Sequence, residues 1–314
     1  MEIVLVMGYP ASGKSSWALA NFPKHRRINR DALGDKTLDD LVPLAAAALD
    51  EGAPVVLDNT YADRASRASI VALAKARGVP VRAVVLDTSI EDAQYNAAER
   101  MVRKYGSLPS PADIKKLARK DPNTFGPSVL FRYRKVAEEP SVAEGFAAVE
   151  KVRFARAAQP DGYVNKGVLL DYDGTLRRTK SGAKYPLTPD DVEVLPGRAE
   201  VLRRYAAQGY KLLGVSNQSG VSKGDLTDEG ARACFQRTNE LLGVDIEVSF
   251  CPHEPAPIGC FCRKPMPGMA VAHIERHRLA RAHTVMVGDM TTDRTFAARA
   301  GVRFVDQGEF FAGG

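Results

Sequence analysis

The first half of the chain alternates short apolar runs with stretches in which apolar residues recur at helical spacing. The apolar runs predict strands at residues 2–7, 54–58, 79–87 and 148–152, with another short strand ending at Ile28. Between them, the spacing of apolar positions predicts helices at 14–21, 37–51, 63–77 and 89–104. Strands and helices that alternate in this way predict a parallel sheet with helices on both faces, an α/β fold.

Two segments interrupt this alternation. Residues 107–135 are polar and rich in Lys and Arg, and prolines break them into short helices, which is typical of a helical lid rather than of a core. Residues 156–166 lose the periodicity and contain Pro160 and Gly162, which predicts a linker. We therefore expect two domains, residues 1–157 and residues 158–314.

The second half of the chain starts the alternation again. Strands are predicted at 166–171, 210–215, 246–250, 284–287 and 302–305, and helices at 196–208, 227–243, 267–277 and 292–299. This pattern predicts a second parallel sheet, so the expected fold class is α/β with two parallel-sheet domains. A length of 314 residues agrees with two domains of ordinary size.

Composition excludes several classes of protein. Hydrophobic residues make up 45% of the chain and charged residues 26%, which is ordinary for a globular protein and excludes a disordered or collagen-like chain. No apolar run reaches the length of a membrane helix, and Met1 leads directly into a strand without the pattern of a signal peptide. We therefore expect a cytoplasmic protein with no membrane partner.

The net charge of +6 is distributed unevenly. Residues 1–160 carry 24 Lys and Arg against 19 Asp and Glu, giving +5, whereas residues 161–314 carry 20 against 19, giving +1. A positive excess suits a polyanionic partner such as nucleic acid, although many ordinary enzymes have one.

A phosphate-binding motif follows the first predicted strand. Gly8-Tyr9-Pro10-Ala11-Ser12-Gly13-Lys14-Ser15 matches the pattern G-x-x-x-x-G-K-[ST], stands between an apolar strand and a helix, and is followed by Ser16. The glycines let backbone amides surround phosphate oxygens, Lys14 places a positive charge at the β- and γ-phosphates, and the Ser15 hydroxyl can bind Mg²⁺. The motif predicts a bound nucleoside triphosphate, ATP or GTP, with Mg²⁺.

Four charged residues elsewhere in this half are candidates for the transfer reaction. Asp31, at the end of a predicted strand, can accept the proton of a hydroxyl substrate, although an Asp here can also be a helix N-cap or a surface residue. Asp58 ends another apolar strand, where it suits the second coordination sphere of Mg²⁺ or the positioning of substrate. Arg100 and Arg103 lie on the helix that enters the lid, and one of them can reach a transferring phosphoryl group. A solvated basic helix face is the alternative for both, and for Arg103 above all.

These motifs resemble those of the polynucleotide 5′-kinase/3′-phosphatase family. The shared segments are the phosphate loop, Asn29-Arg30-Asp31-Ala32-Leu33-Gly34, Asp58-Asn59-Thr60 with Ala65-Ser66-Arg67, and Tyr133-Arg134-Lys135 with Ala143-Glu144-Gly145-Phe146. The resemblance spans nearly the whole first half. It implies a kinase with a helical lid in which Asp31 is the general base, Arg100 is the lid arginine, and Arg103 and Arg134 bind the nucleotide.

A second set of motifs begins at an apolar strand that ends in Asp171-Tyr172-Asp173-Gly174-Thr175. Two carboxylates at this spacing can share one Mg²⁺, and one can attack phosphorus while the other handles the proton of the leaving group. The same residues on an isolated loop would suit a Ca²⁺ site instead. Further polar residues follow at or near the ends of later segments, namely Ser216, Lys264, Asp289 and Asp293.

Motifs in this order resemble those of the haloacid-dehalogenase (HAD) superfamily of phosphatases. The resemblance implies that Asp171 is the nucleophile that becomes an aspartyl-phosphate and that Asp173 is the general acid and base. It also implies that Ser216 and Lys264 hold phosphoryl oxygens, and that Asp289 completes a Mg²⁺ site with Asp171 and Asp173, supported by Asp293. Residues 174–195 are too few for a separate cap domain, so we expect a Rossmannoid phosphatase without a large cap, open to the end of a polymer.

Three of the four cysteines are clustered with a histidine. Cys251, His253, Cys260 and Cys262 form a closed tetrahedral ligand set typical of structural Zn²⁺, the alternative being unliganded side chains on a Pro-rich loop. The fourth, Cys234, lies mid-helix and is expected in the core. The Cys/His loop resembles that of histidinol-phosphate and heptose-bisphosphate phosphatases, whereas residues 179–186 and 308–311 resemble the animal 3′-phosphatase.

The resemblances together imply an enzyme that heals nucleic-acid ends. It would phosphorylate 5′-OH ends and remove 3′-phosphates from DNA or RNA, producing ends that a ligase can join. One alternative is a metabolite kinase fused to a histidinol-phosphate or sugar-phosphate phosphatase. Another is a nucleotide-gated nucleic-acid-binding module with a vestigial phosphatase, which the complete set of acidic motifs argues against.

Overall fold

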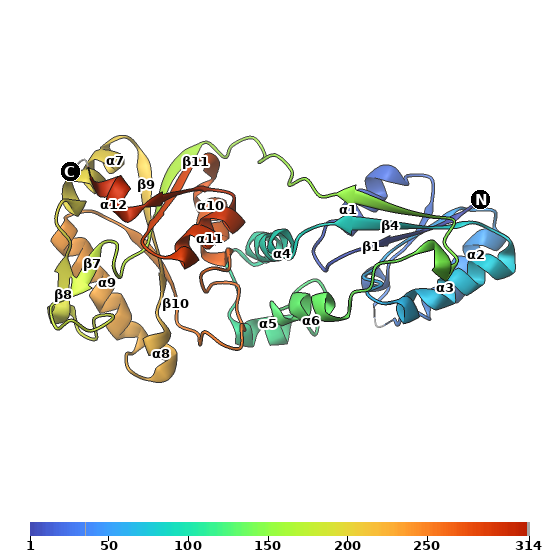
Figure 1. Cartoon of the computed structure of the whole chain (residues 1–314), viewed down its shortest axis with the longest axis horizontal. Coiled ribbons are helices and arrows are strands. Elements are labelled where there is room, and N and C mark those ends of the chain that lie inside the picture. The colour runs from blue at the N-terminus through green and yellow to red at the C-terminus, as the bar shows by residue number, and fades with distance from the viewer. Residues whose placement is uncertain (35, 313–314) are drawn as a thin grey trace. The chain divides into compact units, whose positions relative to one another are not determined.

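The computed structural model describes residues 1–34 and 36–312, which fold into two compact units. One unit consists of Met1–Ala97 with Lys115–Arg156, and the other of Ala98–Ile114 with Ala157–Gly314. Figure 1 shows the helices and strands of each unit. No helix in the described part of the chain is long and apolar enough to cross a membrane.

The first unit is built on a five-stranded parallel sheet with the order β2-β3-β1-β4-β5. Its strands are β1 (Ile3–Met7), β2 (Arg26–Ile28), β3 (Val55–Asp58), β4 (Val81–Asp87) and β5 (Ala148–Arg153). Its helical segments are α1 (Lys14–Asn21), η1 (Arg30–Ala32), α2 (Leu41–Asp50), α3 (Arg64–Arg77), α6 (Ser128–Val136) and η2 (Val142–Glu144). Two further helices, α4 (Ile90–Tyr105) and α5 (Pro111–Leu117), each contribute residues to both units.

Helices cover both faces of this sheet because successive side chains of a strand point to opposite faces. Ile3 and Leu5 of β1 pack with residues of α2 and α3, whereas Val4 and Val6 pack with Ala18 of α1 on the other face. Every residue of β1 is buried, as expected for the central strand of a sheet covered on both sides. The alternating strands and helices expected from the sequence are therefore confirmed, including two short helices where the lid was predicted.

The second unit contains another five-stranded parallel sheet, with the order β10-β9-β6-β11-β12. Its strands are β6 (Asn165–Leu170), β9 (Tyr210–Asn217), β10 (Glu247–Cys251), β11 (Leu279–Gly288) and β12 (Arg303–Asp306). Its helical segments are η3 (Pro189–Asp191), α7 (Arg198–Ala207), α8 (Ser219–Lys223), α9 (Asp228–Leu242), α10 (Gly268–His277), α11 (Thr291–Ala300) and α12 (Gln307–Phe311). Val168 and Leu170 of β6 pack toward α7 and α9, and Leu169 packs toward α10 and α11.

The structure adds elements that the sequence did not predict. β7 (Arg177–Thr179) pairs with β8 (Val192–Val194) as a two-stranded antiparallel sheet, which occupies part of the stretch judged too short for a cap. β11 begins at Leu279, earlier than expected, and its pairing with β6 is irregular between Leu279 and Thr284. The short helices α8 and α12 were also missed, because five residues are too few to show helical spacing.

Candidate active sites

The phosphate loop lies between β1 and α1, and Lys14, Ser15 and Ser16 form the first turn of α1. Its backbone turns through positive φ at Gly8, Ala11 and Gly13, so consecutive amides line a concave loop at the start of the helix. The predicted residues from Gly8 to Ser16 are therefore brought together in one continuous loop and helix start.

Hydrogen bonds from Lys14, within the loop, and from two residues elsewhere in the unit fix the shape of this loop. The Lys14 ammonium donates to the carbonyls of Gly8 at 3.1 Å and Tyr9 at 2.6 Å. From the outside, Thr88 donates to the Ser12 carbonyl at 3.2 Å, and Asn96 donates to the Ala11 carbonyl at 2.9 Å. A loop held in this way has the curved backbone that phosphate binding requires.

A helix of the predicted lid packs against the phosphate loop. The ring of Tyr133, on α6, lies 4.7 Å from the ring of Tyr9, measured between centroids. Burial raises the pKa of the Tyr133 hydroxyl to about 12, so the phenol stays neutral. This contact brings α6, which carries Arg134, next to the nucleotide site expected at the loop.

A polar network joins the ends of β2 and β3 beside Asp31. Asp58 is 1% exposed, and its two carboxylate oxygens accept hydrogen bonds from Arg27 at 2.9 and 2.8 Å. Asn29 donates to the Asp58 carbonyl at 2.6 Å, and its side-chain oxygen caps η1, which carries Asp31. Asp31 itself keeps a partly exposed carboxylate, 3.4 Å from Arg30. The role of Asp31 as a base, and that of Asp58 in binding Mg²⁺, stay predictions.

Sequence reasoning did not assign roles to Arg27 and Asn29, which position this segment. Arg27 lies in β2 and Asn29 directly follows it. Polar residues at the carboxyl end of a parallel strand often belong to a site, and this position is the feature of the sequence that could have indicated them.

The remaining predicted arginines make other contacts in the described structure. Arg103 donates to the Glu275 carboxylate at 2.8 and 3.2 Å and to Glu99 at 3.1 Å. Arg134 lies over the ring of Phe131, 5.2 Å from its centroid. Arg100 lies on α4, in the part of that helix that is assigned to the second unit, as Arg103 does. Nucleotide binding by these arginines stays a prediction.

In the second unit, carboxylates from distant segments meet at one edge of the sheet. Asp171 follows β6, and Asp289 and Asp293 follow β11, so all three lie at carboxyl ends of neighbouring parallel strands or just beyond. Their nearest oxygens lie within 4.8 Å of one another. The Lys264 ammonium bridges Asp171 at 2.6 Å and Asp293 at 2.7 Å. The structure thus assembles most of the predicted set around one point.

Asp173 has different partners from the other carboxylates. Its two oxygens accept hydrogen bonds from Arg177 and from Gln218, both at 2.8 Å. Gln218 also lies 3.0 Å from the hydroxyl of Ser216, which is buried in β9 beside the site. Asp173 does not belong to the carboxylate cluster, so its predicted share in the Mg²⁺ site stays a prediction. Arg177 and Gln218 were not predicted from the sequence.

Burial controls the ionisation of this cluster. It raises the pKa of the Asp171 carboxyl, and the adjacent Lys264 ammonium opposes that rise. Burial alone would lower the pKa of Lys264, but the carboxylates of Asp171 and Asp293 outweigh it, and the pKa is raised. Burial likewise raises the pKa of Asp289. Three carboxylates facing one ammonium leave an excess of negative charge on hard oxygen donors, which fits Mg²⁺.

Gly174 is required where the chain turns over this site. Its φ of +89° lies in the left-handed region, and a Cβ at this position would clash with the Asp289 carboxylate. The glycine of the Asp-x-Asp-Gly motif is therefore explained by the close approach of Asp289.

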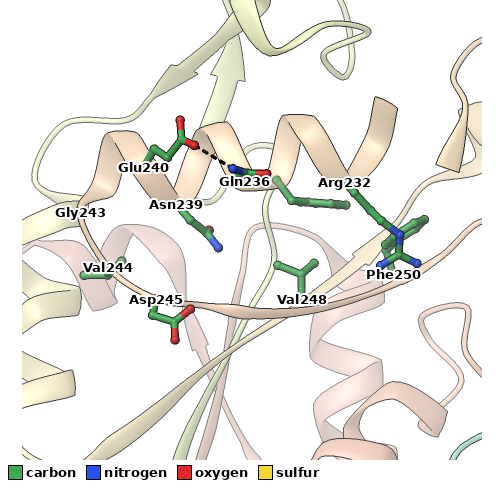
Figure 2. Close-up of a pocket in the computed structure, with 10 residues that line it drawn as sticks. Arg232, Gln236, Asn239, Glu240, Gly243, Val244, Asp245, Val248 and Phe250 are labelled. Atoms are coloured by element: carbon green, nitrogen blue, oxygen red, sulfur yellow. Dashed lines mark hydrogen bonds between the residues drawn. The ribbon is translucent and has the colours of Figure 1, made fainter. Parts of the chain in front are cut away.

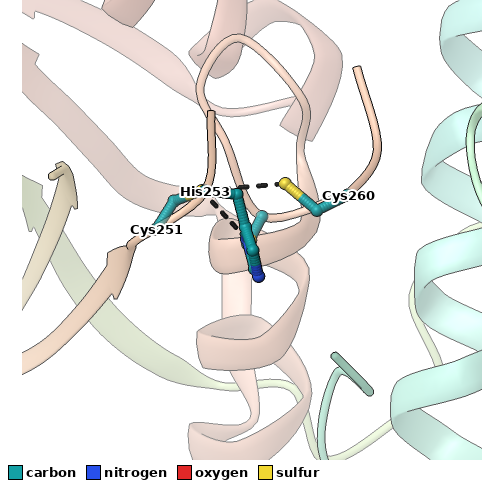
Figure 3. A group of neighbouring side chains, drawn as sticks. Cys251, His253 and Cys260 are labelled. Carbon is teal, nitrogen blue, oxygen red and sulfur yellow. Dashed lines mark hydrogen bonds between the residues drawn. The ribbon is translucent and has the colours of Figure 1, made fainter. Parts of the chain in front are cut away.

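The Cys/His cluster has the geometry of a tetrahedral ligand set. Cys251, His253, Cys260 and Cys262 place one ligand atom each within 4.8 Å of the others, and Figure 3 shows three of them facing one another. Cys251 Sγ lies 3.6 Å from Cys260 Sγ, and His253 Nδ1 lies 3.4 and 3.3 Å from the sulfurs of Cys251 and Cys262. Tetrahedral Zn²⁺ separates two sulfurs by roughly 3.8 Å, and a sulfur from a nitrogen by roughly 3.6 Å. The donor set therefore fits zinc.

The thiols of this cluster do not ionise independently. A hydrogen bond from Cys251 lowers the pKa of Cys260, while hydrogen bonding to Cys260 raises that of Cys251 and hydrogen bonding to Cys251 raises that of Cys262. Three adjacent thiolates would repel one another unless a cation lay between them. Cys234, as expected, is buried away from this set in α9.

Removing zinc is expected to destabilise the second unit. Cys260→Ala should lower the bound zinc from one ion per chain to none and lower the melting temperature of this unit by about 10 °C, because lost metal binding is lost folding free energy. Metal content and differential scanning calorimetry measure both. Cys234→Ala, which removes the cysteine outside the cluster, is the matched control and should retain zinc. Full zinc retention in Cys260→Ala would contradict the assignment.

A separate hollow lies between α9 and β10 in the second unit. This cavity of about 690 Å³ is lined in part by Arg232, Asn239, Val248 and Phe250, as Figure 2 shows. None of the predicted catalytic residues lines it. It is therefore distinct from the carboxylate cluster.

Comparison with known proteins assigns each half of the chain to a class. The model of an AAA domain matches residues 3–119, and that of the HAD-hydrolase-like family matches residues 261–306. The D-glycero-beta-D-manno-heptose-1,7-bisphosphate 7-phosphatase of Helicobacter pylori is 31% identical over 144 residues, covering 44% of this chain and 81% of the relative. A probable enzyme of the same name from Thermoplasma acidophilum is 32% identical, covering 46% and 91%.

Solved structures also align along nearly the whole chain. A chain of the Pnkp1/Rnl/Hen1 RNA repair complex covers 97% of this chain and 96% of its own length, at 15% identity and a TM-score of 0.33. The family matches and the two assembled sites show that the chain joins an N-terminal P-loop kinase domain to a C-terminal phosphatase domain, which belongs to the HAD-like family together with the heptose-bisphosphate 7-phosphatases.

Proposed function

We propose that this protein heals nucleic-acid ends, phosphorylating 5′-OH ends and removing 3′-phosphates. The observation that carries the proposal is a second assembled phosphoryl-transfer site in the same chain as the phosphate loop. Asp171, Lys264, Asp289 and Asp293 converge in one unit, while the loop and Asp31 lie in the other. A chain that both adds and removes phosphate suits a nucleic acid whose 5′ end must gain a phosphate and whose 3′ end must lose one.

In the kinase, the residues act by binding and by proton transfer. The loop amides and Lys14 hold the phosphates of the nucleotide, and Asp31 accepts the proton of the 5′-hydroxyl as its oxygen attacks the γ-phosphorus. Arg27 and Asn29 keep the Asp31 segment in place through their contacts with Asp58. Ser15 and Asp58 would hold Mg²⁺, which neutralises charge on the phosphates.

In the phosphatase, Asp171 is the nucleophile. Its carboxylate attacks phosphorus, and Asp173 gives a proton to the leaving oxygen. Asp173 then takes a proton from the water that hydrolyses the aspartyl-phosphate, which restores both groups. Ser216 and Lys264 hold phosphoryl oxygens. Asp171, Asp289 and Asp293 would hold Mg²⁺, which supplies positive charge that stabilises the phosphoryl oxygens in the transition state.

Three features support a nucleic-acid substrate. The motifs of the first half resemble those of the polynucleotide kinase/phosphatase family across nearly its whole length. Most of the positive excess of the chain lies in residues 1–160, which suits binding of a phosphate backbone. In the phosphatase, the small β7–β8 pair and the single-turn η3 are the elements described between the Asp-x-Asp motif and α7, and neither is large enough to form a domain that would exclude a polymer end.

A second candidate is a metabolite kinase fused to a sugar-phosphate phosphatase. The observation that favours it is the relationship to heptose-bisphosphate 7-phosphatases, with which this chain shares 31–32% identity in the two examples above. These relatives cover less than half of this chain, so they carry no information on the kinase substrate.

The proposal is tested with two oligonucleotides, one with a 5′-OH end supplied with ATP and Mg²⁺, the other with a 3′-phosphate end. We expect phosphate transfer to the first and phosphate release from the second. Asp31→Asn should reduce transfer by about 10²- to 10⁴-fold, the usual contribution of a general base, and leave release unchanged. The exposed Asp39→Asn is the matched control. Failure to process either end would overturn the proposal.

A further inference from the structure

An arginine is buried directly behind the carboxylate of Asp173. Arg177, on β7, is 1% exposed, and no motif assigned it a role. Its Nε donates to one oxygen of Asp173 at 2.8 Å, while Gln218 donates to the other oxygen at the same distance. The Asp173 carboxylate is therefore held at both oxygens, by two elements that come from different parts of the chain.

The guanidinium of Arg177 is itself tightly fixed. Its Nη1 donates to the hydroxyl of Thr238 on α9 at 3.1 Å. It also lies over two aromatic rings, 4.7 Å from the centroid of Phe235 and 5.3 Å from that of Tyr172. These two rings meet edge to face at 82°, and the Tyr172 hydroxyl donates to Asn239 at 2.7 Å. A guanidinium that is fixed by a hydrogen bond and by two aromatic rings can define the orientation of the carboxylate that it binds.

Stability alone does not explain a charged group in this place. A buried ion pair is often no more stabilising than apolar side chains of the same volume, because both charges lose their hydration. The pair also lies next to the reacting centre, since Asp173 is two residues from Asp171 on the same turn. The backbone closes that turn, with Gly174 N donating to Arg177 O at 2.9 Å and Arg177 N donating to Tyr172 O at 3.0 Å.

We infer that Arg177 is a positioning residue of the phosphatase, which orients the Asp173 carboxylate together with Gln218. This inference rests on the proposed roles of Asp171 and Asp173. In the first step, the Asp171–phosphorus bond forms, the bond to the leaving oxygen breaks, and the proton of Asp173 moves to that oxygen. In the second step, water attacks phosphorus, its proton moves to Asp173, and the Asp171 carboxylate is released with inorganic phosphate.

The two steps depend differently on the orientation of Asp173. p-Nitrophenolate is stable as an anion and leaves without receiving a proton, so with p-nitrophenyl phosphate the first step proceeds while Asp173 is ionised and does not need a well-placed acid. The second step needs Asp173 as a base with any substrate, and with this substrate the proton that Asp173 takes from water passes to solvent before the next turnover. A disoriented Asp173 should therefore slow the second step selectively and make the phosphorylated enzyme accumulate.

The test is a burst measurement with p-nitrophenyl phosphate and the Arg177→Lys variant of the full chain. Lysine keeps the charge but cannot contact Asp173 and Thr238 at the same time. We expect a burst of close to one p-nitrophenolate per chain, at a rate within about twofold of wild type, because that step needs no acid. Steady-state turnover should fall by about 10- to 100-fold, the cost of a misplaced catalytic group.

Arg178→Lys is the matched control, because Arg178 is the next residue, is exposed and pairs with Glu193 at the surface. It should behave as wild type. A variant that fails to fold is recognised independently, by the loss of its cooperative thermal unfolding. In that event Thr238→Val decides the question and should show the same pattern with a smaller effect, because it removes the outer contact of Arg177 together with one hydrogen bond to the Cys234 carbonyl inside α9.

The inference is overturned if burst and turnover fall in equal proportion, or if Arg177→Lys and Thr238→Val both match the control. Either result leaves the proposed phosphatase intact, provided that wild-type hydrolysis is lost in Asp171→Asn. Absence of any hydrolysis that depends on Asp171 would instead overturn the phosphatase roles, and the inference with them.

Discussion

Replacing Asp171 by Asn is expected to reduce phosphate release from any substrate by about 10⁴-fold or more, in line with the loss of a nucleophile. An amide cannot form the aspartyl-phosphate, and the negative charge that Lys264 contacts at 2.6 Å is lost with it. Kinase activity, which depends on the other unit, should be unchanged. Single-turnover release of phosphate measures the first activity, and transfer from ATP measures the second.

The control for this variant is Asp161→Asn, an exposed aspartate near the start of the second unit. It removes the same charge without touching the cluster, so phosphate release should be retained. Substantial release by Asp171→Asn, with no phosphorylated protein detectable in wild type, would show that another group attacks phosphorus.

Replacing Lys14 by Met is expected to have the largest effect on the kinase. The ammonium bridges the carbonyls of Gly8 and Tyr9 within the phosphate loop, and the motif assigns it to contact the phosphates of a nucleotide. Its loss should slow phosphoryl transfer by about 10²- to 10³-fold, the usual cost of removing one preorganised positive donor from a transition state. The rate of transfer at saturating ATP is the measurement.

Lys24→Met is the matched control, because Lys24 is exposed and lies outside the loop. It should transfer phosphate at the wild-type rate. Phosphatase activity should be the same in both variants. A Lys14→Met enzyme with undiminished transfer would contradict the assignment of the loop as the nucleotide site.

The fold was predictable because its signals are local and periodic. The alternation of strands and helices follows from the apolar spacing, and the two chemical motifs stand at strand ends, where parallel sheets gather their polar residues. The Cys/His set was predictable for a similar reason, since short spacing between soft ligands limits where they can meet. The β7–β8 pair was missed because strands of three residues have no detectable period.

The supporting residues of the sites were less predictable. Arg177 and Gln218 both contact Asp173, but they come from separate segments, and nothing in their local sequence indicates which way they point. An isolated Arg in a sequence is far more often exposed than buried. Arg27 was missed in the same way, because its bond to Asp58 depends on the pairing of β2 with β3. Contacts of this kind emerge only once the strands are assembled.

The central claim is that both sites act on nucleic-acid ends. The most direct measurement is kcat/KM of the phosphatase for an oligonucleotide 3′-phosphate, compared with a heptose or hexose bisphosphate and with histidinol phosphate, using one enzyme preparation that also phosphorylates a 5′-OH oligonucleotide. The account predicts that kcat/KM for the oligonucleotide exceeds that for each small molecule by about 10²-fold or more, a difference of roughly 2.7 kcal/mol in transition-state binding. A preference for a small-molecule phosphate, with no transfer of phosphate to the oligonucleotide, would contradict it.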